Sequence, residues 1–101
     1  MPSLTLSAVS YLEVLQGIRN KSELAAVKKM LLHRSAKVIP VSETISHRAI
    51  ELMELLTLSH GLQLDDALIA ATAVDQRLPV LTANVRHFSA VAGLQVEAFQ
   101  L

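Results

Sequence analysis

Alternation of apolar residues and helical periodicity together divide the chain into short strands and longer helices. Strands are expected at Leu4–Leu6, Lys37–Val41, Leu78–Thr82 and Leu94–Ala98. Helices are expected after Ser7 to about Ile18, after Asn20, between Ser42 and Gly61, and from Ala67 to about Gln76. Strands that alternate with helices predict βα units and a mainly parallel sheet.

Polar residues and glycine mark the ends of these helices. Ser7 and Ser42 are expected to cap their helices, and Asn20 with Glu23 fits a capping box. Gly61 is expected to end the long helix in the left-handed conformation. The core should contain the apolar stripe of that helix and the alanine-rich helix after it, where Thr72 is expected to pack. The stripe consists of Ile45, Ala49, Leu52, Met53 and Leu56.

Composition limits the class of protein. The 101 residues suit one domain, and the 51% hydrophobic content suggests that a partner covers some apolar surface. Nine basic and nine acidic residues cancel, so a nucleic-acid substrate would need a local patch. The absence of cysteine, of a readable signal peptide and of a long apolar run predicts a cytoplasmic protein.

Ligands of parallel sheets bind at the carboxyl ends of the strands, which directs attention to the residues after Leu6, Leu64 and Leu81. Three segments there resemble motifs of one family: LSAVSYLEVLQG (6–17), LDDALIAATA (64–73) and VLTANVRHF (80–88). They resemble the second, third and fourth motifs of PIN-domain ribonucleases of the VapC toxin type. The resemblance extends from about Leu4 to Val96, and the third motif is its most specific part.

The resemblance implies a PIN-like three-layer α/β domain over residues 1–101, with a mainly parallel sheet flanked by helices. It implies an endoribonuclease that depends on Mg²⁺ or Mn²⁺. Matched motif to motif, Glu13 and Asp66 would be metal ligands, Asn84 would complete the catalytic set, and Thr82 would support it. Hard divalent ions prefer oxygen ligands, and a bound ion activates water and neutralises charge on phosphate.

The resemblance also implies RNA as substrate, a cognate antitoxin and a homodimer. One feature of the family is missing, because it begins with a strand that ends in an acidic motif and no Asp or Glu precedes Glu13 here. We therefore expect an N-terminally truncated PIN-like domain whose catalytic activity is in question. The alternatives are a non-catalytic PIN-derived binding or dimerisation module, and a plain α/β domain.

Each candidate residue also has an ordinary structural interpretation. Glu13 can be a solvated helix residue, although it lies beside apolar positions. Asp65 suits the start of any helix, and Asn84 suits a turn. Arg86 and His87 are expected to be a surface pair. The remaining histidines and a group of basic residues are expected at the surface or core edge: His33, His47, His60, Lys28, Lys29, Arg34 and Lys37.

Overall fold

A computed structural model describes residues 4–82 and 85–98, and it contains four α-helices, one 3-10 helix and four strands in that part of the chain. The elements are β1 (Thr5–Ser7), α1 (Ala8–Gln16), α2 (Lys21–His33), β2 (Lys37–Ile39), α3 (Glu43–His60), α4 (Leu64–Gln76), β3 (Val80–Thr82), η1 (Val85–Phe88) and β4 (Val96–Ala98). All four predicted strands and all four predicted helices are therefore confirmed, and their ends differ from the predicted ones by at most three residues.

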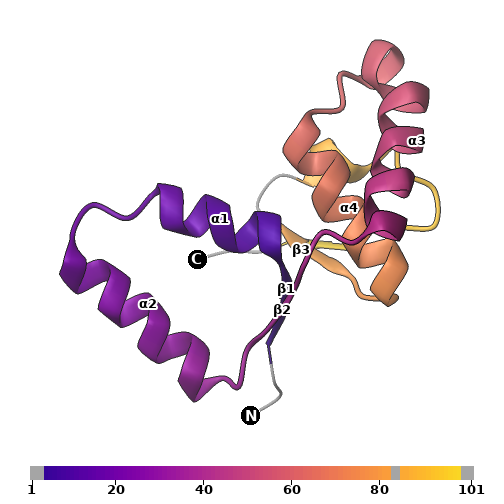
Figure 1. Cartoon of the computed structure of the whole chain (residues 1–101). Helices are drawn as coiled ribbons and strands as arrows, with labels where there is room; N and C mark the ends of the chain where they lie inside the picture. Colours follow the sequence, from indigo (N-terminus) through magenta and orange to yellow (C-terminus); the bar gives the residue numbers. More distant parts are fainter. Residues whose placement is uncertain (1–3, 83–84, 99–101) are drawn as a thin grey trace. The chain divides into compact units, whose positions relative to one another are not determined.

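The chain divides into two compact units, residues 1–40 and 41–101. In the N-terminal unit β1 pairs in parallel with β2, and Leu6 lies opposite Val38. In the C-terminal unit β3 pairs in parallel with β4, and Leu81 lies opposite Glu97. The described strands thus confirm an α/β fold with parallel pairing. The described strands form two two-stranded sheets, β1 with β2 and β3 with β4 (Figure 1).

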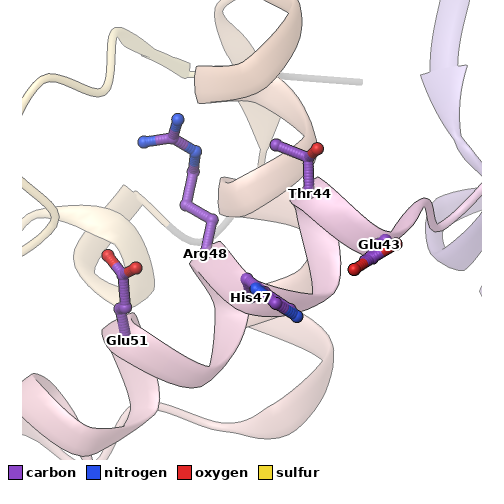
Figure 2. A pocket seen from close by; sticks show the side chains of 5 residues that line it. All are labelled: Glu43, Thr44, His47, Arg48 and Glu51. Carbon is purple, nitrogen blue, oxygen red and sulfur yellow. The ribbon is translucent and has the colours of Figure 1, made fainter.

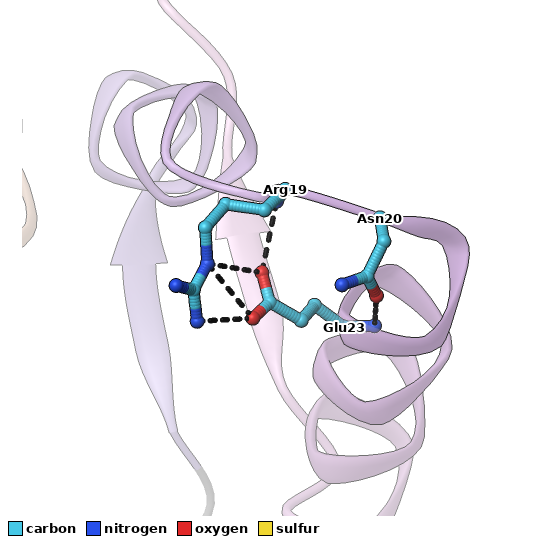
Figure 3. Close-up of polar contacts among 3 residues, drawn as sticks. All are labelled: Arg19, Asn20 and Glu23. Atoms are coloured by element: carbon cyan, nitrogen blue, oxygen red, sulfur yellow. Dashed lines mark hydrogen bonds and ion pairs between the residues drawn. The ribbon is translucent and has the colours of Figure 1, made fainter.

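Capping explains why the helices of the N-terminal unit begin where they do. The Ser7 hydroxyl accepts the backbone N–H of Ser10 at 2.9 Å, and the Asn20 side chain accepts that of Glu23 at 2.9 Å. The expected reciprocal bond differs by one residue. The Glu23 carboxylate accepts the backbone N–H of Arg19, at 2.8 Å, and also the Arg19 guanidinium at 2.8 Å (Figure 3). The charged pair shifts the carboxylate away from the usual capping-box position.

The C-terminal unit is built on the packing of α3 against α4, which lie side by side in Figure 1. Ile45, at 1% exposure, Ala49 and Leu56 are buried on α3, as the predicted stripe requires. Facing alanines of α4 are equally buried, because a methyl side chain allows the helices to approach closely. These are Ala67, Ala70, Ala71 and Ala73. The core of this unit therefore contains residues of both segments predicted to be apolar, the stripe of α3 and the alanine-rich helix α4.

Side-chain capping and backbone conformation explain where the helices of the C-terminal unit begin and end. Ser42 caps α3 through the N–H of Ile45 at 3.2 Å, and Gly61 ends it in the left-handed conformation with φ 64°. Helix α4 begins at Leu64, three residues before its expected start, and Gln63 precedes it without a side-chain cap. Asp65 and Asp66 consequently lie inside the first helical turn. No helix in the described ranges is long and apolar enough to span a membrane.

Candidate functional site

The first turn of α4 presents a buried carboxylate. Asp66 retains only 7% exposure, although aspartate is almost never buried without a partner. It lies four residues before Ala70, which is fully buried, so both side chains lie on the buried face of α4. Asp65 beside it is half-buried, and its carboxylate accepts the backbone N–H of Asp66 at 3.0 Å. Asp65 thus has a helix-start role, while Asp66 needs a further explanation.

His87 reaches this carboxylate from the short helix η1. Its Nδ1 lies 3.4 Å from Oδ2 of Asp66, and about half of the His87 side chain remains exposed. The next residue, Phe88, is 3% exposed and fixes η1 in the core, and η1 packs against both α4 and β4. Two residues that are 21 positions apart therefore meet because the chain returns to the start of α4 after β3.

The electrostatics of Asp66 favour a cation nearby. Burial raises the pKa of Asp66, the charge of Asp65 raises it further, and His87 acts in the opposite direction. The ionised form is thus disfavoured by its surroundings, and an added positive charge would stabilise it. A divalent ion is the kind of group that would supply this charge when the site is in use.

The other predicted site residues lie in other elements or outside the described residues. Glu13 lies in α1 of the N-terminal unit and is exposed, as are the apolar residues Leu12 and Val14 beside it. Thr82 ends β3, in register with Ala98. Asn84 lies outside the described residues. The convergence of Glu13 with Asp66, and the role of Asn84, stay predictions.

The remaining polar candidates have ordinary roles. Thr72 is buried and donates its hydroxyl to the Leu68 carbonyl at 2.8 Å, which agrees with a packing role. His33, His47 and His60 are exposed, as expected. A shallow hollow of about 250 Å³ lies on the solvent face of α3, and Figure 2 shows that its side chains all project from that one helix. They are Glu43, Thr44, His47, Arg48 and Glu51, and none of them is buried.

The donors around Asp66 fit part of a metal-binding set. Within residues 4–82 and 85–98, no three acidic, histidine or cysteine side chains gather around one point. Asp66 and His87 offer one oxygen and one nitrogen donor, and magnesium or manganese sites commonly leave other positions to water and substrate phosphate. The two residues therefore suit a divalent ion that has further ligands from elsewhere.

A family model described as the PIN domain matches residues 2–94. The chain belongs to the PIN-domain family. Two curated relatives from Mycobacterium tuberculosis, both named Ribonuclease VapC10 and from strains CDC 1551 and H37Rv, are 41% identical over 86 residues. The match covers 84% of this chain and 62% of each relative, so the chain spans less than two thirds of their length.

Solved structures with the same PIN fold include toxin–antitoxin complexes. A complex from Klebsiella pneumoniae has a TM-score of 0.75 at 26% identity, and the match covers 93% of this chain and 73% of the other. VapBC2 from Rickettsia felis, bound to a promoter DNA fragment, has a TM-score of 0.80 at 20% identity, with 97% and 76% covered. These likenesses support the predicted fold class of the PIN domain.

The expectation that His87 lies at the surface is confirmed, since about half of its side chain is exposed, but sequence reasoning missed its contact with Asp66. The signal that could have indicated it is positional: His87 closely follows the carboxyl end of a parallel strand, where ligands gather, and precedes a buried aromatic residue. The pairing partner itself was not readable, because nothing in the spacing of residues 66 and 87 predicts their contact.

Proposed function

We propose that this chain acts as the ribonuclease part of a VapC-type toxin, which hydrolyses RNA phosphodiester bonds with the help of Mg²⁺ or Mn²⁺. The catalytic residues in this proposal are Glu13, Asp66 and Asn84, with Glu13 and Asp66 as metal ligands. The observation that carries it is the buried carboxylate of Asp66 in the most specific of the family's motifs. The 41% identity to proteins named as ribonucleases supports the same activity.

Each residue has a defined task in this proposal. Asp66 is already held on a rigid helix, which limits its side chain to one region and lowers the entropy lost on binding an ion. Glu13 brings a second carboxylate from α1, and the Asn84 amide offers a neutral oxygen. These residues would hold a divalent ion, which would supply an activated water and neutralise charge on the phosphate.

The proposed partners are an RNA substrate, a cognate antitoxin and a second copy of the chain, and the proposed location is the cytoplasm. Toxin–antitoxin complexes among the similar structures support an antitoxin. Large apolar side chains that are exposed in the N-terminal unit suit coverage by another protein. They are Leu12, Val14, Met30 and Leu32.

One observation favours a second function, that of a non-catalytic binding or dimerisation module. Among the described residues no three acidic, histidine or cysteine side chains gather around one point, as a metal site built fully from protein ligands would require. A chain without a working metal site would keep its protein-binding surface and lose hydrolysis. Both functions use the same fold, and they differ in whether the carboxylates hold a working metal ion.

Cleavage of a labelled RNA separates these two functions. The wild-type chain should cleave in the presence of Mn²⁺ and stop when EDTA removes it, and Asp66→Asn should lose at least about 100-fold in rate. Asp75→Asn, a change of a half-buried aspartate at the other end of α4, is the matched control and should keep the activity. Equal, metal-independent rates for all three proteins would refute the ribonuclease and leave the binding module.

A further inference from the structure

The position of His87 raises a question that the carboxylates alone do not answer. An imidazole next to a buried carboxylate can donate a hydrogen bond to the carboxylate. Alternatively, the imidazole and the carboxylate can both bind the same metal ion. The separation of 3.4 Å between Nδ1 and Oδ2 is longer than the 2.7–2.9 Å of a strong charge-assisted hydrogen bond. The geometry is therefore that of two groups that face one another without a tight bond between them.

That same separation suits two ligands of one ion. Donor atoms that each lie about 2.1 Å from an octahedral ion such as Mn²⁺ are about 3.0 Å apart at a right angle. The 3.4 Å separation of Nδ1 and Oδ2 exceeds this spacing by about 0.4 Å, which a small rotation of the half-exposed His87 side chain can close. The anchoring of Phe88 on one side and of Ala67 on the other keeps the two elements at this spacing.

We propose that His87 is a nitrogen ligand of the divalent ion, together with Asp66, and that the site therefore prefers Mn²⁺ to Mg²⁺. This inference rests on the proposed metal-dependent function and names the ion that it uses. The chemical reason is that Mg²⁺ takes oxygen ligands and binds imidazole poorly, whereas manganese and later transition metals accept it. A His–Asp pair consequently selects against magnesium in a way that two carboxylates do not.

The charges around the pair support this assignment. Asp65 and Asp66 are consecutive, and the ion pair described for the Asp66 carboxylate is the one with His87. Histidine binds a metal as the neutral imidazole, so the ion itself would supply the positive charge that this acidic turn lacks. The half-exposed His87 ring leaves the open side of the site accessible to water and to a phosphate.

Pulsed electron paramagnetic resonance of bound Mn²⁺ tests the ligand directly, because a coordinated imidazole produces ¹⁴N modulation that carboxylates and water do not. The wild-type chain should show this modulation, and His87→Gln should lose it while Mn²⁺ still binds, with affinity lower by roughly 10- to 100-fold. His47→Gln removes an exposed histidine from α3 and should leave the signal intact.

Calorimetric titration gives the second readout. Wild type should bind Mn²⁺ at least about tenfold more tightly than Mg²⁺, and His87→Asp should reduce that ratio because it replaces nitrogen by oxygen. Manganese bound without ¹⁴N modulation would overturn the role of His87 and leave the ribonuclease standing. Absence of any Mn²⁺ binding would overturn both. Modulation without RNA cleavage would support the ligand and refute the activity.

Discussion

The two units of this PIN domain reach stability by different means. In the N-terminal unit the helices α1 and α2 bury no residue, and their ends are held by Ser7, Asn20 and the Arg19–Glu23 pair. In the C-terminal unit α3 and α4 bury nine residues between them, Asp66 among them. Local hydrogen bonds therefore shape the first unit, whereas tertiary packing shapes the second.

This difference also separates the two proposed metal ligands. A buried, charged residue is costly, and it is tolerated where the surrounding packing is strong enough to hold it in place. Asp66 lies in the better-packed unit, on a helix with a continuous alanine face. Glu13, the second ligand of the proposal, lies on a helix that buries no residue.

The largest expected effect tests whether the packed core of the C-terminal unit carries more of the stability than the helices of the N-terminal unit. Ile45→Ala should lower the free energy of unfolding by about 2–5 kcal/mol, because it leaves a cavity at a fully buried site. Leu32→Ala, at a residue that is 81% exposed in α2, should change it by less than about 0.5 kcal/mol. Urea unfolding of both variants measures this, and equal losses would contradict the comparison.

Alanines offer a second test, because both units contain them on helices. Ala71→Leu places a large side chain at a position with no exposure and should destabilise by about 1–3 kcal/mol. Ala26→Leu makes the same change on an exposed face of α2 and should be close to neutral. Thermal unfolding followed by circular dichroism distinguishes them. A neutral Ala71→Leu would mean that α3 and α4 pack loosely.

The buried carboxylate of Asp66, which the proposed function requires, should lower the stability of the folded chain at neutral pH. Burial raises the pKa of Asp66, so its contribution to stability is fully present below the pKa of the unfolded chain and is lost as pH rises through the folded pKa. Metal-free Asp66→Asn should therefore be more stable than wild type at neutral pH, by about 0.5–2 kcal/mol.

That gain should shrink as pH falls through the raised pKa of Asp66 and should be gone below the ordinary aspartate pKa, where Asp66 is protonated in the folded and the unfolded chain. Glu54→Gln, on the exposed side of α3, is the control and should show no such gain. Denaturant unfolding at several pH values measures the difference. An Asp66→Asn variant less stable than wild type at pH 7 would show that the carboxylate stabilises the unit instead.

The smallest effect concerns the exposed charge pair of the N-terminal unit. The hydrogen bonds from the side chain and then the backbone of Arg19 lower the pKa of Glu23, so its contribution is present above the unfolded pKa and is lost as pH falls through the folded one. Nuclear magnetic resonance titration should give a lowered Glu23 pKa that moves back up in Arg19→Gln. Equal values would show that the pair does not form in solution.

Much of the local structure could be read from residues. Ser42, Asn20 and Gly61 act as predicted, because capping and left-handed turns depend on a few neighbouring positions. The apolar stripe of α3 was also predictable, because helical periodicity shows which face of a helix is apolar. The start of α4 was not, because Leu64 and Asp65 continue the helix without a side-chain cap to mark it.

The same distinction between local signals and tertiary contacts applies to the candidate site. The sequence by itself determined the family motifs, the position of Asp66 and the short-range signals that shape each helix, because these depend on residue type and spacing. Only the tertiary structure decided that Asp66 is buried and that His87 faces it at 3.4 Å, because that contact requires α4, β3 and η1 to fold onto one core. Contacts between distant residues come from packing, which no local pattern encodes.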